Sequence, residues 1–444
     1  MFPKSDHRTM ELVRQAAYPL TGAPSDYDPV LDLAGDARFI LLGEASHGTH
    51  EFYRHRAQIT KRLIEEKGFD AVAVEADWPD AYRINQFVRG QGEDADAIDS
   101  LTGFQRFPTW MWRNADVLDL VGWLRNHNER HPEKKAGFYG LDLYSLYASI
   151  RAVLDYLDKV DPDAARRARH RYACFEHFGE DTQAYGYAAS RGLSKTCEDE
   201  AFGQWLEMCR RAGDLSRRNG RVLPDAFFFA EQNARLIKNA EEYYRSMFGR
   251  RISSWNLRDN HMADTLDALS RHLDAGNSRI VVWAHNSHLG DARATEMGEQ
   301  GELNLGQLVR QRYEKDAVLI GFTTFTGTVT AASEWDAPAE RKRVLPALPE
   351  SYEALFHKTG IPNFMLQLRN AGEITTALQE PRLERAIGVI YLPGSERVSH
   401  YFHARLAGQF DAIFHLDTTR AVEPLERVAE WTTGEVPETF PSAL

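Results

Sequence analysis

Short, continuous apolar runs recur along this chain and most limit the folds that it can adopt. Runs that lack polar alternation are typical of strands covered on both faces, as in a parallel sheet. The stretch between the first two runs has Phe52, Ile59 and Leu63 on one helical face and ends at Lys67-Gly68. We therefore predict an α/β fold, with a mostly parallel central sheet flanked by helices. The expected strands are RFILLG (38–43), FDAVAVEAD (69–77), AGFYGLDL (136–143), RIVVWAHN (279–286), AVLIGFTT (317–324), NFMLQL (363–368), AIGVIYL (386–392) and DAIFHLD (411–417).

Residues 144–275 differ from the rest because they are charged and rich in helical periodicity. We interpret them as a large helical insertion or lid between two halves of the α/β core. The predicted division is residues 1–143 for the first half, 276–432 for the second half and 433–444 for a tail.

Composition excludes several classes of protein. Lys and Arg number 53 against 65 Asp and Glu, a balance of −12 that argues against a general nucleic-acid binder. No run approaches the length of a membrane span, and the N-terminus lacks a secretory apolar region, so a cytoplasmic protein is expected. The three cysteines are odd in number and form no CxxC, which favours reduced thiols over a disulfide framework.

Ionisable residues stand at the carboxyl ends of four predicted strands, where open parallel sheets bind their ligands. A helix N-cap is an alternative reading for Asp77 and for Asp142. RFILLGEASH and RIVVWAHNSH can also be aligned residue by residue. This alignment predicts Glu44 beside His285 and His47 beside His288. The strand-end residues are Glu44, His47, Glu75, Asp77, Asp142, His285 and His288.

Spacing tests remove several catalytic motifs. Gly43 to Gly48 reads G-x-x-S-x-G, one residue out from a nucleophile elbow, so Ser46 is a weak nucleophile whose hydroxyl binds ligand or caps a helix. His50 and His55 are five apart, which fails the zinc-helix spacing H-E-x-x-H. The chain contains neither a P-loop nor a G-x-G-x-x-G fingerprint.

A mixed cluster of histidines and carboxylates remains, and it suits general-base activation of water. Arg56 is a candidate cation for the oxyanion and Arg83 a weaker one, with a surface ion pair as the alternative for each. The same cluster can instead hold zinc or manganese, and spacing does not separate the two readings. The metal ligands would be His47, Glu75, His285 and His288.

Aromatic residues offer candidate pocket walls. Trp110 and Trp112 either line a pocket or pack in the core, and core packing is expected for Trp123 and for residues 227–229. Asp259 and His261 stand at a polar helix start, where they either overhang the site or form a solvated face.

Several motifs in chain order resemble the erythromycin esterase family: LLGEASHGTHEFYRHRAQITKRLIEEKGFDAVAVEAD, FYGLDLYS, NLRDNHMADTL and VVWAHNSHLG. The resemblance implies an α/β core with helical additions and an esterase that acts on a small-molecule ester or lactone; the enzymes that name the family open macrolide lactones. We expect that no cofactor is required, with a divalent metal such as zinc or manganese as the alternative. The implied roles are general base for His47, carboxylate neighbours for Glu44 and Glu75, a substrate or oxyanion contact for Arg56, and the opposite wall for His285 and His288.

Alternatives to the esterase stay open at this point. They are a metal-dependent hydrolase of amide or phosphoester bonds, and a non-catalytic relative that only binds its ligand. No nucleic-acid or membrane partner is expected, and the sequence does not give the oligomeric state.

Overall fold

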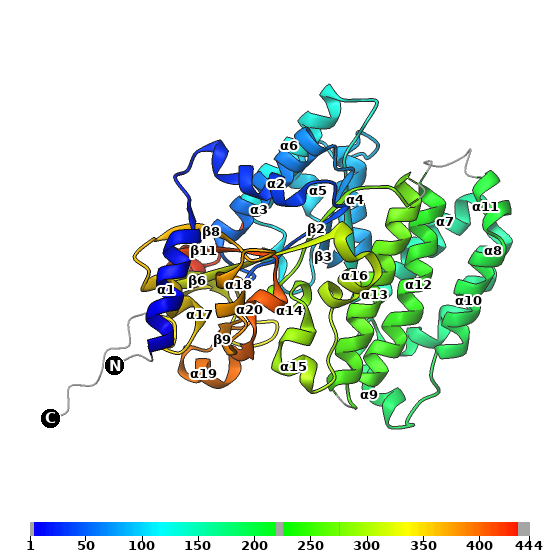
Figure 1. Ribbon diagram of the computed structural model, residues 1–444. Coiled ribbons are helices and arrows are strands. Elements are labelled where there is room, and N and C mark those ends of the chain that lie inside the picture. The colour runs from blue at the N-terminus through cyan, green and yellow to red at the C-terminus, as the bar shows by residue number, and fades with distance from the viewer. Residues whose placement is uncertain (1–3, 219–224, 250, 275, 434–444) are drawn as a thin grey trace.

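The computed structural model describes residues 4–218, 225–249, 251–274 and 276–433, and the predicted tail lies almost wholly outside them. A central sheet crosses the molecule, with helices on both sides and a group of long helices beside it (Figure 1). The strands are β1 (Tyr18–Pro19), β2 (Phe39–Leu42), β3 (Ala71–Asp77), β4 (Gly137–Asp142), β5 (Ile280–Trp283), β6 (Ala317–Ala331), β7 (Glu340–Val344), β8 (Asn363–Gln367), β9 (Arg382–Arg385), β10 (Tyr401–Ala404) and β11 (Ala412–Thr419).

The main helices before the sheet's second half are α1 (Lys4–Ala16), α2 (Asp28–Ala34), α3 (His50–Lys67), α4 (Trp78–Val88), α5 (Ala97–Leu101), α6 (Ala115–Arg130), α7 (Leu146–Val160), α8 (Pro162–Tyr172), α9 (Thr182–Ser190), α10 (Glu198–Arg210), α11 (Ala212–Arg218), α12 (Ala226–Ser246) and α13 (Arg251–Asp274). Those that follow are α14 (Asn286–Leu289), α15 (Glu296–Glu299), α16 (Leu305–Tyr313), α17 (Tyr352–His357), α18 (Glu373–Ala377), α19 (Glu396–Ser399), α20 (Leu406–Gln409) and α21 (Ala429–Thr433).

In the described part of the chain, nine strands form the main sheet in the order β1-β8-β11-β6-β2-β5-β3-β4, with β7 paired to β6. The pairs from β11 through β4 are parallel, whereas β8, β1 and β7 join antiparallel to their neighbours. This confirms the predicted α/β class. Strands β2, β5, β3 and β4 are adjacent and parallel, so their carboxyl ends open on one edge.

Both faces of the sheet are buried, which is why its strands read as continuous apolar runs. Phe39 and Leu41 of β2 belong to a core shared with α1, α7, α12 and α13. Ile40 and Leu42, which point to the other face, belong to a core shared with α2, α3, α4 and α6. Helix α3 buries Phe52, Ile59 and Leu63 as predicted and ends at Gly68, whose φ of 69° is left-handed.

Helices α7 to α13 lie between β4 and β5 in the chain and gather on one side of the molecule (Figure 1). Helix α12 packs against α7, α9, α10 and α13, while α13 also contacts β4 and leads into β5. This path carries residues of α13 to the open edge of the sheet. The division into two core halves and an insertion stays a prediction.

Two sequence expectations are wrong. Residues 386–392 form isolated bridges at Ile387 and Ile390 instead of a strand, because their apolar side chains pack over β6 and β7. Cys174 and Cys197 form a disulfide although reduced thiols were expected, and Cys209 is free. An odd count without CxxC carries no information about which cysteines meet in space.

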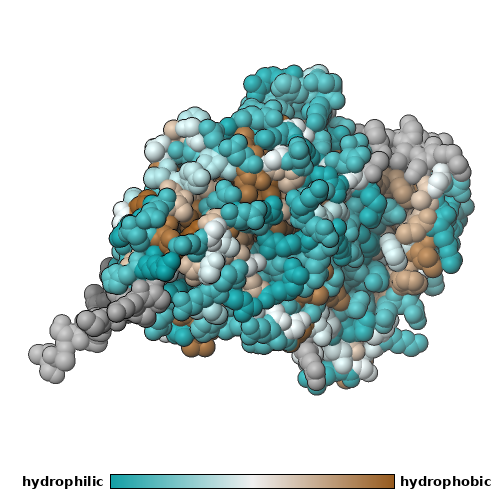
Figure 2. All heavy atoms as spheres, in the orientation of Figure 1, coloured by the Kyte–Doolittle hydropathy of each residue, from teal (hydrophilic) through white to brown (hydrophobic). Residues whose placement is uncertain are grey.

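The face drawn in Figure 2 is mostly hydrophilic, with apolar residues in small groups. Within the described residues, none of the helices is both long enough and apolar enough to cross a membrane.

Candidate active site

The loop that follows β2 is held by backbone hydrogen bonds to segments distant in sequence. The Ile387 N–H donates to the Ala45 carbonyl at 2.8 Å, and the His47 N–H donates to the Ile387 carbonyl at 3.3 Å. Gly48 accepts from the Thr330 N–H at 3.0 Å, and a Cβ at Gly48 would collide with the Thr330 backbone. The position of His47 is therefore fixed by three strand-like contacts.

His47 and Glu44 form a hydrogen-bonded dyad at the end of β2. Nδ1 of His47 lies 3.0 Å from Oε1 of Glu44, and Arg56 donates from Nη2 to the other Glu44 oxygen at 2.6 Å. Because a carboxylate only accepts, Nδ1 carries the hydrogen and Nε2 of neutral His47 keeps its lone pair. Nε2 has no hydrogen-bond partner within the described residues and His47 lines two cavities, which is the arrangement of a general base.

Arg56 lies behind the dyad. Its side chain is fully buried, with Cζ 4.4 Å from the ring centroid of Tyr53 and 4.7 Å from that of Trp283. The expected contact between Arg56 and substrate or oxyanion is wrong for this geometry, because the guanidinium faces Glu44 and the core. Arg56 instead pairs with Glu44 and holds its carboxylate in position.

Arg258 of α13 is the cation at the open edge, and the sequence analysis missed it. Nη2 of Arg258 donates to Glu75 at 2.7 Å and to Asp142 at 2.7 Å, while Nε donates to Asp142 at 3.0 Å. Burial works to raise the pKa of Glu75, but His288, Arg258 and His47 more than offset it and hold the pKa well below its usual range. Glu75 and Asp142 are therefore ionised, and Asp142 is no helix cap.

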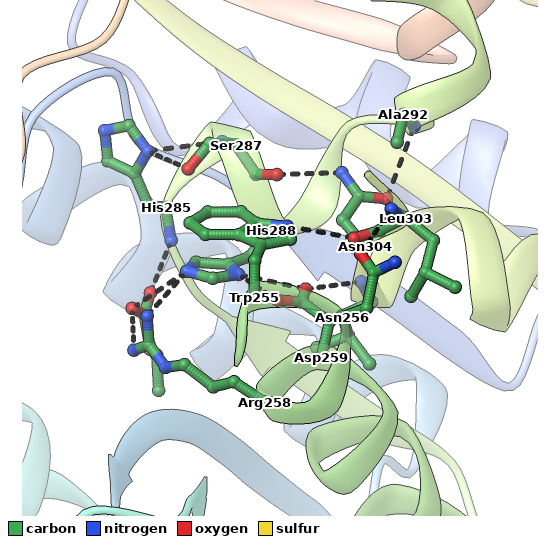
Figure 3. Close-up of polar contacts among 12 residues, drawn as sticks. Trp255, Asn256, Arg258, Asp259, His285, Ser287, His288, Ala292, Leu303 and Asn304 are labelled. Atoms are coloured by element: carbon green, nitrogen blue, oxygen red, sulfur yellow. Dashed lines mark hydrogen bonds and ion pairs between the residues drawn. The ribbon is translucent and has the colours of Figure 1, made fainter. Parts of the chain in front are cut away.

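His288 lies between Asp259 and Arg258 (Figure 3). Nδ1 of His288 contacts both carboxylate oxygens of Asp259 at 2.9 and 3.0 Å, and Arg258 donates to Nε2 at 3.0 Å. The Trp255 ring stacks on the imidazole with centroids 4.5 Å apart. Burial lowers the pKa of His288, but Asp259 and Glu75 outweigh it and raise the pKa. Both ring nitrogens of His288 therefore form hydrogen bonds within the protein.

His285 stands at the start of α14 and caps it. Nδ1 of His285 accepts from the Ser287 N–H at 3.2 Å and lies 2.8 Å from the Ser287 hydroxyl. Its own backbone N–H donates to Oε2 of Glu75 at 2.9 Å. Burial, with a further contribution from His47, lowers the pKa of His285 to about 3, so the ring is neutral and Nε2 carries the hydrogen. The rings of His285 and His47 lie 4.9 Å apart.

Two cavities meet at this site. The first cavity, about 180 Å³, is lined by residues of the 104–112 loop, Asp77, Asp80, Tyr144 and Trp335. The second cavity, about 430 Å³, is lined by His285, Ser287, His288 and residues 398–402. His47, Glu75 and Arg258 line both cavities, so His47 stands at their junction.

The remaining sequence candidates divide between this site and the core. Trp112 lines the first cavity, whereas Trp110 is 3% exposed within the core. The buried Ser46 hydroxyl bonds to Thr49 and does not face ligand. Asp77 stands at the start of α4 but pairs with Arg106 instead of capping the helix.

Other candidates lie away from the cavities or act through a neighbour. Asp259 is buried in contact with His288, so it neither overhangs the site nor belongs to a solvated face. His261 is buried in contact with Asn239. Arg83 forms the expected outer ion pair with Asp94. The alignment of the two strand ends held for Glu44 and His285, since β2 and β5 pair in that register, but His47 faces His285 and not His288.

The residues that sequence spacing offered as metal ligands do not form a metal cage. Nδ1 of His47 is bonded to Glu44, and both nitrogens of His288 are bonded to protein groups. Arg258 bonds to both Glu75 and Nε2 of His288, so a guanidinium already supplies the positive charge at this point. Across the described ranges, no group of three or more His, Cys, Asp or Glu side chains is arranged to hold a metal ion.

Comparison with known proteins agrees with this architecture. The chain is 24% identical over 432 residues to erythromycin esterase type II of Escherichia coli, covering 90% of this chain and 93% of the relative. It is 22% identical over 312 residues to the putative hydrolase YbfO of Bacillus subtilis, covering 67% of each.

Solved structures share the fold. A protein described as a succinoglycan biosynthesis protein superposes with a TM-score of 0.76 at 21% identity, covering 95% of this chain and 100% of that one. A mutant of the erythromycin esterase EreC in its open conformation superposes with a TM-score of 0.67 at 18% identity, covering 90% and 95%.

A family model described as erythromycin esterase matches residues 64–419. The match begins after Glu44 and His47, so the roles of these two residues rest on geometry. It covers most of the chain, including β3 to β11 and α13. The chain therefore belongs to the erythromycin esterase family.

Proposed function

We propose that this protein hydrolyses a carboxylic ester or lactone by direct attack of water that His47 activates. The observation that carries the proposal is the Glu44–His47 dyad, whose free Nε2 stands where two cavities meet beside the Arg258 guanidinium. Family membership supports a hydrolase, and the names of the relatives favour ester bonds.

The first step is proton removal from water. Nε2 of His47 takes one proton, the hydroxide oxygen bonds to the carbonyl carbon, and the carbonyl electron pair moves onto oxygen. Glu44 stabilises the resulting imidazolium, since Nδ1–H already donates to it and Arg56 holds it in position. In the second step the oxyanion collapses, the C–O bond breaks and Nε2–H protonates the leaving alkoxide.

Arg258 is the proposed donor to the oxyanion. Four of the five N–H groups of Arg258 are bonded to Asp142, Glu75 and His288, which leaves one N–H on Nη1 without a partner in the described part of the chain. Nε2–H of His285 is buried, so His285 forms part of the wall and is not assigned as a donor to the oxyanion. Donors fixed before the reaction stabilise developing charge most effectively, and removal of one typically costs about 10²–10³ in kcat.

The proposed reaction needs no metal. Support comes from the hydrogen bonds that already occupy the candidate ligands, with Arg258 supplying the positive charge. The substrate is proposed to be a small molecule whose ester or lactone group reaches the junction of the cavities.

A substrate panel with and without chelator tests this function. p-Nitrophenyl esters and lactones are compared with the matching anilides and phosphate esters, each in EDTA. We expect ester and lactone hydrolysis to survive EDTA and to fall about 10²–10⁴-fold in His47→Ala. The control His131→Ala changes a half-exposed surface histidine and should keep full activity. Turnover of only anilides or phosphates, or activity that EDTA removes and added zinc restores, would contradict the proposal.

A further inference from the structure

The first cavity has an acidic lining. Four carboxylates and two guanidiniums line it, and three of the four carboxylates form ion pairs with these guanidiniums. Asp77 receives two hydrogen bonds from Arg106, while Glu75 and Asp142 share Arg258. Both guanidiniums are thereby occupied by these three carboxylates.

Asp80 is the exception among these acids. It lines the cavity from the first turn of α4, and no ion pair or hydrogen bond reaches its carboxyl group within the described residues. Burial, followed by the nearby Asp77, raises the pKa of Asp80 to about 7. Arg106, Arg83 and Arg151 act against this rise, but none of them bonds to the carboxyl group in the described part of the chain, and the pKa stays raised.

The other walls of the cavity are aromatic. Phe104 and Trp112 lie with ring centroids 6.2 Å apart, and Phe107 and Trp335 lie 5.0 Å apart. The Tyr144 face is already covered, since Cζ of Arg106 and Cζ of Arg258 each lie 4.8 Å from its centroid. Phe104 and Trp112 are each 5% exposed, whereas Phe107 and Trp335 are more exposed and offer rings of the kind that attract a cation. Trp335 is 49% exposed, which places it at the opening.

We propose that the first cavity binds a protonated or quaternary amine of the substrate, with Asp80 as its counterion and Phe107, Trp112 and Trp335 as an aromatic wall. The volume of about 180 Å³ accommodates a substituted ammonium group and not a whole drug-sized molecule. The inference rests on the proposed ester hydrolysis: the amine lies in the first cavity, and the scissile carbonyl lies at the junction beside His47.

A matched pair of probes tests charge recognition without any turnover. Choline and 3,3-dimethylbutan-1-ol have nearly the same shape and differ in the positive charge. Binding of each is measured by isothermal titration calorimetry at pH 8 to the wild type, to Asp80→Asn and to Asp155→Asn. Asp155 is an exposed acid that lines a separate cavity between α4 and α7, so Asp155→Asn controls for the loss of one negative charge.

We expect choline to bind the wild type about tenfold more tightly than its neutral isostere, with the difference lost in Asp80→Asn and kept in Asp155→Asn. Choline should also compete with an ester substrate and lower its apparent kcat/KM, whereas the neutral alcohol should not. Equal binding of the two probes overturns the inference, as does a preference for choline that survives Asp80→Asn.

The design separates this inference from the proposed function. Ester hydrolysis without choline binding leaves the hydrolase standing and refutes the amine subsite. Asp80-dependent choline binding in a protein that hydrolyses none of the esters supports the subsite and refutes the hydrolase.

Discussion

Arg258→Met tests the charge network at the open edge of the sheet. The guanidinium is shared by Glu75 and Asp142, whose side chains are 3% and 4% exposed. Removing one partner of a buried ion pair leaves uncompensated charge and costs about 3–5 kcal/mol. We expect a loss in this range in the free energy of unfolding at pH 8, measured by urea denaturation followed by tryptophan fluorescence.

The loss should depend on pH. In the wild type the lowered pKa of Glu75 contributes stability that is present above its unfolded pKa and lost as pH falls through the folded pKa. Without Arg258, burial raises the pKa of both carboxyls, so they take up protons in mild acid. The penalty of the variant should therefore be smaller at pH 5 than at pH 8.

The matched control is Arg83→Met. Arg83 pairs with Asp94 and its side chain is 40% exposed, so its loss should cost about 0–1 kcal/mol at either pH. An equal cost for the two variants, or a cost of Arg258→Met that does not change with pH, would refute the reasoning.

Three further predictions concern Asp80, the disulfide and a helix cap. The pKa of Asp80 is about 7 in the folded protein against its ordinary value of 3.8, so the wild type loses stability as pH rises between these two values. Asp80→Asn should therefore raise the free energy of urea unfolding by up to about 3 kcal/mol more at pH 8 than at pH 5, and an effect that does not change with pH would contradict this. The double variant Cys174→Ser, Cys197→Ser opens a loop with a sequence separation of 23 and should lower the free energy of unfolding by about 3 kcal/mol. Dithiothreitol should lower the stability of the wild type by the same amount, and a wild type that does not respond to this reductant would argue against the disulfide. Asn114→Ala removes the side-chain acceptor of the Val117 N–H at the start of α6 and should lower stability by about 1 kcal/mol, whereas an unchanged urea midpoint would mean that the cap contributes nothing.

The sequence was informative where one local pattern decides the outcome. Continuous apolar runs identified β2 through β6, β8 and β11, since strands buried on both faces carry no polar alternation. The convergence of Glu44, His47, Glu75 and His285 followed because parallel strands end on one edge. The run at 386–392 has the same apolar composition, but it packs over β6 and β7 and forms only isolated bridges. Composition does not distinguish such a segment from a strand of the sheet.

The misses at the site have one physical origin. Arg258 lies within α13 and Asp80 in the first turn of α4, and nothing in the local sequence marks either one, because only tertiary packing brings them to the cavities. Arg56 is spaced suitably for the site, yet its side chain turns beneath Glu44 to stack on Tyr53 and Trp283. Side-chain direction and the pairing of α13 with β4 depend on the whole fold.

The central claim is that Glu44 and His47 act as one base, and a double-mutant cycle tests it most directly. kcat/KM for an ester that the wild type hydrolyses is measured for His47→Ala, Glu44→Gln and the double variant. Because Glu44 acts only through His47, the double variant should be no slower than His47→Ala alone. Multiplicative losses, or a His47→Ala variant that keeps more than about a tenth of wild-type activity, would contradict the account.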